Sequence, residues 1–324
     1  MPRFNLKVAA VVIPAALLLA ACGGSNESAT PADTSAPAAA TSTLSGEIRA
    51  DGSSTVAPLA AAAGELFTSA NPDVNVSVAT SGTGGGFKKF CAGETDISNA
   101  SRPIKDEEKE LCAAAGIEFT ELIVANDALT VVVNNDNDWA TCLTVEELNK
   151  IWAPESEGTI TNWSQIRAGF PDVELDLYGP GTDSGTFDYF TDEVNGEEGA
   201  SRTDYNPSED DNVIVQGVEG AAGATGYFGL SYFNENADKL KAVEIDGGAG
   251  CVQSSSENAQ AGLYVPLARP LFIYVANEAA KRPEVAAFID FFITDNDAVT
   301  SKALFIPLNA EQVATAESAI AGLK

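Results

Sequence analysis

The sequence has no histidine among its 324 residues. That absence excludes a Ser-His-Asp triad, a Cys-His pair and a histidine-ligated zinc site, because each of them needs an imidazole. No Gly-Lys-Ser/Thr follows the glycine-rich runs, so a Walker A loop is excluded, and the dinucleotide-binding fingerprint is not met. No pair of acidic residues can be picked out at a spacing that favours glycoside hydrolysis. We therefore expect no enzymatic activity and assign no catalytic residue, no metal site and no cofactor.

Basic residues are scarce. Lys and Arg number 18 against 47 Asp and Glu, which gives a formal net charge of -29. This balance argues against a nucleic-acid partner, because binding to a phosphate backbone needs a basic face. The same charge balance does not exclude a small anionic ligand. Local hydrogen-bond donors decide such binding, while net charge affects solubility and long-range steering.

The apolar segment at 8–21 is too short for a membrane-spanning helix and follows two basic residues, as in a signal peptide. It ends in Leu-Ala-Ala-Cys-Gly at 19–23, which resembles the bacterial lipobox, so we expect residues 1–21 to be removed and Cys22 to be lipidated. The alternative is an ordinary signal peptide with a chance cysteine. Residues 22–45 are rich in Ser, Ala, Thr and Pro and are expected to form a flexible tether. We predict an exported protein that is anchored by lipid alone to the outer face of the cell membrane, in a periplasm or at the cell surface.

The remaining sequence alternates between strand and helix patterns, which is typical of an α/β fold. We expect strands at 46–50, 74–79, 117–125, 129–133, 175–178, 227–230, 242–245 and 271–275. We expect helices at 58–69, 87–91, 105–115, 145–151, 187–194, 213–222, 285–292 and 312–323.

Four loops rich in Gly, Ser and Thr stand before expected helices, at 52–55, 81–84, 98–102 and 183–186. A helix N-terminus has unsatisfied N–H groups and a partial positive charge, glycine allows close approach of a ligand, and hydroxyls add donors. Loops of this kind can together bind an oxyanion with few formal charges. The alternative for each single loop is ordinary helix capping by its Ser or Thr.

Several longer motifs occur in one order along the chain. They are 51–58 (Asp-Gly-Ser-Ser-Thr-Val-Ala-Pro), 81–88 (Ser-Gly-Thr-Gly-Gly-Gly-Phe-Lys), 96–103 (Asp-Ile-Ser-Asn-Ala-Ser-Arg-Pro), 127–134, 178–187 (Tyr-Gly-Pro-Gly-Thr-Asp-Ser-Gly-Thr-Phe) and 266–274. With these motifs the sequence resembles, from about residue 46 to residue 308, the PstS family of phosphate ABC-transporter binding proteins. The resemblance implies the two-lobe, type II periplasmic-binding-protein fold. Each lobe would be a mixed sheet flanked by helices.

The resemblance also implies a division of the chain. Residues 46–127 and 267–324 would form the first lobe and residues 128–266 the second, with two hinge crossings near 126–127 and 266–269. The ligand would be held in the cleft between the lobes. We interpret Arg269, at the second crossing, as a hinge or ion-pair residue, and acidic residues such as Glu193 and Glu198 as a solvated face.

A phosphate site follows from the same resemblance. Its oxygens would accept hydrogen bonds from the hydroxyl or backbone N–H groups of Ser54, Thr55, Thr83, Ser101, Ser184, Gly185 and Thr186, and Arg102 would supply a positive charge. Some family members have an Arg where this chain has Pro180 and Gly181, and an Asp acceptor where it has Ser101. Asp183 and Asp51 are the candidates to replace that acceptor, which matters because protonated phosphate can donate to a carboxylate and sulfate cannot.

The implied function is high-affinity capture of inorganic phosphate by a monomer that delivers it to the permease and ATPase subunits of an ABC importer. Three alternatives remain. The same fold can bind another oxyanion such as sulfate or molybdate, or can serve as a surface phosphate sensor or adhesin. A secreted phosphatase is the third, although the sequence offers no histidine for it.

Four further cysteines, Cys91, Cys112, Cys142 and Cys251, are an even number in an exported protein and indicate two disulfides. Three pairings are possible. We favour Cys91 with Cys112 and Cys142 with Cys251, because each pair then lies within one predicted lobe. The alternative is four free buried thiols.

Overall fold

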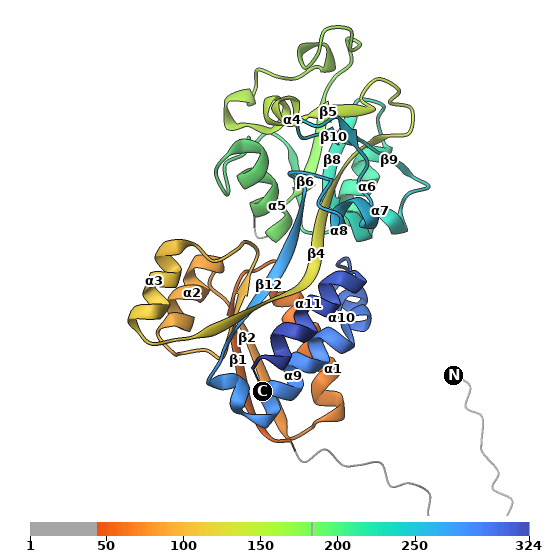
Figure 1. Ribbon diagram of the computed structural model, residues 1–324. Helices are drawn as coiled ribbons and strands as arrows, with labels where there is room; N and C mark the ends of the chain where they lie inside the picture. Colours follow the sequence, from red (N-terminus) through yellow and green to blue (C-terminus); the bar gives the residue numbers. More distant parts are fainter. Residues whose placement is uncertain (1–43, 183, 324) are drawn as a thin grey trace, which may run out of the picture. The chain divides into compact units, whose positions relative to one another are not determined.

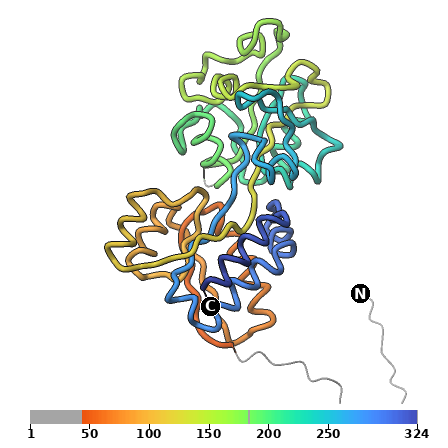
Figure 2. The backbone as a smooth tube through the Cα atoms, in the orientation of Figure 1, coloured from red at the N-terminus to blue at the C-terminus, as the bar shows by residue number. Residues whose placement is uncertain are grey.

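Figures 1 and 2 show a computed structural model of the protein, which describes residues 44–182 and 184–323. The predicted signal peptide, the lipidation site Cys22, nearly all of the tether and the candidate proton acceptor Asp183 lie outside these residues. No helix among the described residues is long and apolar enough to cross a membrane.

The first lobe is a sheet with helices on both faces. Its parallel strands are β1 (Gly46–Gly52), β2 (Val74–Thr80) and β3 (Ile97–Ala100), with β1 in the middle. One face carries α1 (Ala57–Ala70), α9 (Pro283–Thr294), α10 (Asn296–Ala303) and α11 (Ala310–Ala321), and the other carries α2 (Thr83–Cys91) and α3 (Asp106–Ala114).

Helix α1 shows why these segments fold as they do. Leu59, Ala63 and Phe67 recur at a spacing of four residues, so they lie on one face of the helix, and all three are buried. The ring centroid of Phe67 lies 5.5 Å from that of Phe288 on α9. Chain segments separated by more than 200 residues therefore share one core.

Two long strands join the lobes. Strand β4 (Phe119–Asn134) pairs along its first half with β12 (Ala268–Ala276) and along its second half with β8 (Ala224–Gly229) and β9 (Leu240–Ala242). The sheet is therefore continuous in the order β2-β1-β3-β12-β4-β8-β6-β7, with β9 beside β4. Asp127 of β4 stands opposite Arg269 of β12 in this ladder. Figure 2 shows β4 and β12 running side by side between the lobes.

The second lobe has the same layered design. Its sheet includes β6 (Asp176–Pro180) and β7 (Asn206–Ser208), which are parallel to β8 and to each other as the sheet order runs β8-β6-β7. Helices α6 (Asp211–Glu219) and α7 (Leu230–Glu235) cover one core cluster. A larger cluster contains residues of α4 (Val145–Trp152), α5 (Gly185–Phe190) and α8 (Ser256–Gln260).

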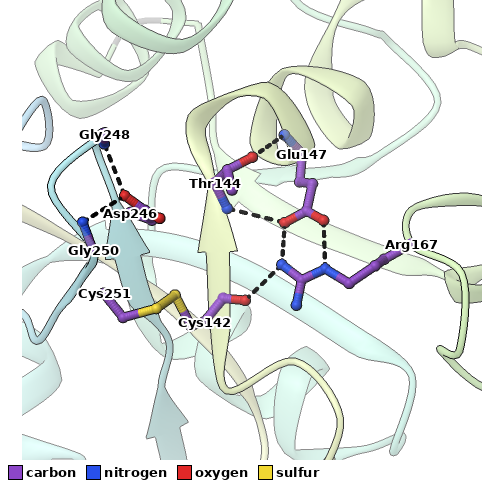
Figure 3. Close-up of a disulfide and its surroundings, with 8 residues drawn as sticks. All are labelled: Cys142, Thr144, Glu147, Arg167, Asp246, Gly248, Gly250 and Cys251. Atoms are coloured by element: carbon purple, nitrogen blue, oxygen red, sulfur yellow. Dashed lines mark hydrogen bonds and ion pairs between the residues drawn. A yellow bond between two sulfur atoms is a disulfide. The ribbon is translucent and has the colours of Figure 1, made fainter.

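A small three-stranded sheet completes this lobe, formed by β5 (Cys142–Thr144), β10 (Glu244–Asp246) and β11 (Cys251–Val252). The disulfide between Cys142 and Cys251 joins its two outer strands (Figure 3). Arg167 binds both the Glu147 carboxylate and the Cys142 carbonyl oxygen beside it. The second disulfide links Cys91 of α2 to Cys112 of α3, so the structure has the pairing that the predicted lobes favoured.

The secondary-structure predictions are largely confirmed, with four differences. The strand expected at 242–245 is two strands, β9 and β10, which belong to different sheets because the chain leaves the large sheet at Val243. The strands expected at 117–125 and 129–133 are one strand, β4. The helix expected at 87–91 begins four residues earlier, at Thr83. Strand β3 and the short elements β5, β7, β11, α7, α8 and α10 were not predicted.

Candidate functional site

A cavity of about 380 Å³ lies between the two lobes. Its first-lobe lining comes from the loops after β1, β2 and β3, namely Ser53, Ser54, Thr55, Ser81, Gly82, Thr83, Gly84, Gly85, Ser101, Arg102 and Lys105. Its second-lobe lining comes from α5, from the π-helical stretch Thr191–Asn195 that continues it and from the segment beyond, namely Asp188, Tyr189, Asp192, Glu193 and Glu198. Arg269 of β12 completes the lining. Three of the four loops singled out in the sequence therefore meet at one cavity.

The three first-lobe loops meet because the carboxyl ends of parallel strands fall on the same edge of a sheet. They also bind one another directly. The backbone N–H of Ser53 donates to the Asn99 carbonyl at 2.9 Å, and that of Ser81 donates to the Gly52 carbonyl at 3.1 Å. Helix α2 can approach this close only because residue 86 is glycine, since a Cβ there would lie 2.5 Å from the Gly52 Cα.

Two of the predicted hydroxyl donors touch. Thr83 opens α2 and Ser101 follows β3, and their hydroxyl oxygens lie 3.1 Å apart. The Ser101 N–H also donates to the Thr83 hydroxyl at 3.3 Å. Both side chains line the cavity with Ser54 and Thr55. This wall therefore presents rotatable hydroxyls beside the N-termini of α1 and α2, which suits a small anion.

The guanidinium of Arg102 is held by a carboxylate of its own lobe. Its two terminal nitrogens donate to the two oxygens of Glu108 at 2.9 and 2.8 Å, and one of them also donates to the Pro103 carbonyl at 3.1 Å. These bonds with Glu108 raise the pKa of Arg102, so it stays a cation. Arg102 thus brings a positive charge to the cavity, with part of its donor capacity already used.

The opposite wall is acidic. Asp188, Asp192, Glu193 and Glu198 line the cavity from the second lobe. Burial raises the pKa of Asp188, with Glu198 adding to the effect, and burial with the neighbouring Asp192 raises the pKa of Glu193. Asp188 and Glu193 are accordingly easier to protonate than exposed carboxylates.

The remaining predicted site residues lie around the cavity. Ser184 caps α5, where its hydroxyl accepts a hydrogen bond from the Thr186 N–H at 3.2 Å. Neither residue belongs to the cavity lining in the described structure, and Thr186 lines a smaller cavity nearby. Gly185 lies against Thr55, because a Cβ at residue 185 would be 2.6 Å from the Thr55 hydroxyl oxygen.

Asp51, a candidate proton acceptor, is buried beneath the first wall. Its carboxylate forms an ion pair with Lys89 and accepts a hydrogen bond from the Ser81 hydroxyl at 2.8 Å. Against the effect of burial, these partners lower its pKa. Asp51 is therefore engaged by the loops, while the other candidate, Asp183, lies outside the described residues.

Comparison with known proteins places this chain in a family. Residues 37–296 match the model of the PBP superfamily domain. The phosphate-binding protein PstS of Staphylococcus saprophyticus is 39% identical over 298 residues, which cover 91% of this chain and 88% of that relative. The chain belongs to the PstS family.

Two further proteins are more similar to this chain in sequence. Protein SphX of Synechococcus elongatus is 48% identical over 265 residues, covering 82% of this chain and 78% of SphX. The crystal structure of a possible phosphate binding protein from Planctomyces limnophilus is 46% identical with a TM-score of 0.81, and the match covers 87% of this chain and 99% of that one. The two-lobe fold predicted from the PstS resemblance is thereby confirmed.

The sequence alone did not place Arg269 or the acidic residues at this cavity. Arg269 lies 3.5 Å from the Asp127 carboxylate, as expected of an ion-pair residue, but it also lines the cavity. The signal that could have found it is the register of β4 against β12, which sets Arg269 opposite Asp127. Among the described residues, no group of three or more acidic or cysteine side chains is arranged to hold a metal ion.

Proposed function

We propose that this protein captures inorganic phosphate in the cavity between its lobes and delivers it to the membrane permease and ATPase of an ABC importer. The single observation that carries the proposal is the convergence of Ser54, Thr55, Thr83, Ser101 and Arg102 on one cavity. Neutral hydroxyls, helix N-terminal N–H groups and a guanidinium are the donors that a tetrahedral oxyanion requires. The curated relative PstS carries the same ligand in its name.

The proposed site has two halves. Ser54, Thr55, Thr83, Ser101 and Arg102 bind phosphate from the first lobe. Ser184, Gly185 and Thr186 join them from the second lobe when the lobes close. The position of Gly185 against Thr55 supports this assignment. Bound phosphate contacts both halves only in the closed form, so it shifts the population toward closure. The lobes are 46–127 with 267–324, and 128–266.

The setting follows from the sequence. We propose removal of residues 1–21, lipidation of Cys22 and a tether at 22–45 that keeps a monomer at the outer face of the cell membrane. The protein acts by binding and release and carries out no reaction on phosphate. Metabolic labelling with a fatty acid, compared between the wild type and Cys22→Ala, tests the anchor.

Isothermal titration of the purified protein with phosphate, sulfate and arsenate tests the binding function. We expect phosphate to bind tightly and Ser101→Ala to weaken it by on the order of tenfold, the lower end expected for a hydrogen bond to a charged group. Ser69→Ala is the control, since Ser69 is an exposed serine at the end of α1 that binds only its own helix backbone. Absence of phosphate binding by the wild type would refute the proposal, and preference for sulfate would identify another oxyanion receptor.

A further inference from the structure

The side chain of Arg269 is placed where three elements meet. It lines the cavity from β12, and one terminal nitrogen lies 3.4 Å from the Thr55 hydroxyl oxygen, to which it donates. Its guanidinium carbon lies 3.5 Å from the centre of the Tyr189 ring of α5. Arg269 therefore contacts a predicted phosphate-binding residue of the first lobe and a cavity-lining residue of the second.

Asp127 and Tyr189 fix the position of this side chain from two sides. Asp127 stands opposite Arg269 in the β4–β12 ladder, with its carboxylate 3.5 Å from the Arg269 Nε. The Tyr189 hydroxyl donates to the Pro266 carbonyl at 2.6 Å, which holds the ring under the guanidinium. A guanidinium stacked on an aromatic ring keeps its N–H groups in the plane of the fork, free to point sideways.

Within residues 44–182 and 184–323, the hydrogen-bonding capacity of Arg269 is mostly unused. A guanidinium has five N–H donors. The Arg269 Nε is buried and has no hydrogen-bond partner among the described residues, and the contact with Thr55 is long. Arg102, by contrast, donates to both oxygens of Glu108 and to a carbonyl at 3.1 Å or less. Arg269 is also the less exposed of the two side chains, at 17% against 31%.

We propose that Arg269 binds the phosphate directly, by donating from its guanidinium to phosphate oxygens next to Thr55, and contributes more to affinity than Arg102 does. This rests on the proposed function. Arg269 meets the Asp127 carboxylate only at 3.5 Å, whereas the terminal nitrogens of Arg102 donate to both oxygens of Glu108 at 2.9 and 2.8 Å. A partly buried guanidinium whose donors are little used gains more from an arriving anion than one whose donors already bind a carboxylate closely. Arg269 then acts both as a hinge residue and as a phosphate-binding residue. Bound phosphate therefore contacts a side chain of β12, one of the two strands that join the lobes.

The test is phosphate titration calorimetry on Arg269→Gln, Arg269→Lys and Arg102→Gln, with the melting temperature of each unliganded protein measured in parallel. The matched control is Arg167→Gln, because Arg167 also pairs with a carboxylate and lies over a ring, at 4.8 Å from the Phe170 centroid, but outside the cavity. We expect Arg269→Gln to bind phosphate at least about tenfold more weakly, Arg102→Gln to lose less, and Arg167→Gln to bind like the wild type.

Arg269→Lys separates a ligand from a structural ion pair. Lysine keeps the charge opposite Asp127 but lacks the planar fork. If the guanidinium binds phosphate, Arg269→Lys stays weaker than the wild type by at least about threefold. Wild-type affinity in Arg269→Lys, or an Arg269→Gln affinity within about twofold of the wild type, overturns the proposal while leaving the phosphate function intact. A wild-type protein that does not bind phosphate overturns both.

Discussion

The two walls of the cavity differ in charge. The first-lobe wall offers hydroxyls, helix N-termini, Arg102 and Lys105, whereas the second-lobe wall offers four carboxylates. An anion is therefore bound mainly from one side and faces negative charge on the other. The acidic residues of the chain are therefore unevenly distributed, because the first-lobe residues that line the cavity include no Asp or Glu. It also gives the two lobes complementary charge where they face each other.

The comparison extends to the crosslinks, where we expect the largest effect. The second-lobe disulfide spans 109 residues of sequence and the first-lobe disulfide spans 21. Because a longer closed loop restricts the unfolded chain more, removing Cys142–Cys251 should cost about 5 kcal/mol of unfolding free energy and removing Cys91–Cys112 about 3 kcal/mol. Denaturant titration of the two double alanine variants measures both. Equal losses would show that loop length does not set the difference between the lobes.

A second prediction concerns the contact between the walls. In Gly185→Ala the new Cβ would lie 2.6 Å from the Thr55 hydroxyl oxygen and 3.2 Å from the Thr55 backbone. The loop must therefore move away from Thr55, and we expect phosphate affinity to fall by about tenfold in calorimetry. Gly229→Ala is the matched control, since a Cβ there meets no atom within 4 Å. Unchanged affinity in Gly185→Ala would mean that the second lobe does not need this contact.

The smallest expected effect comes from the acidic wall. Asp188→Asn with Glu193→Gln removes two negative charges that face the ligand, so at pH 8 we expect phosphate to bind about two- to fivefold more tightly. The pKa values of both carboxyls are raised, which means that lowering the pH protonates them in the wild type and removes the same repulsion. The ratio of variant to wild-type affinity should therefore shrink as pH falls. Titrations across pH check this, and a ratio that grows at low pH would contradict it.

Local patterns were enough to predict most elements, and the exceptions have identifiable physical causes. The polar pair Asn126 and Asp127 predicted a break, but β4 continues because the Asn126 amide binds the Pro307 carbonyl and Gln312, while Asp127 pairs with Arg269. Strand β3 has four residues that are all buried, so no alternation reveals it. Long-range contacts decide both cases.

The candidate site also contains residues that local patterns predict and residues that only long-range contacts place. Its first-lobe residues could be predicted because each loop pattern is contained within a few consecutive residues. Helix α2 begins at Thr83 although three glycines follow, which propensity opposes and the close contact of Gly86 with Gly52 explains. Arg269 could not be placed without the register of two strands more than 140 residues apart. The acidic wall likewise depends on how α5 is oriented toward the other lobe.

The continuous pairing of β4 with β12 sets how the lobes can move. Nine consecutive register positions of β12, from Ala268 to Ala276, are paired with β4, with one irregularity between Leu271 and Phe272. Because Phe272 to Val275 are also paired with β3, the part of β12 that joins the lobes as a two-stranded ribbon with β4 is 268–271. We expect opening and closing of the lobes to change the twist of this ribbon. The range of motion between the open and closed forms is then limited by how much this ribbon can twist before its inter-strand hydrogen bonds break.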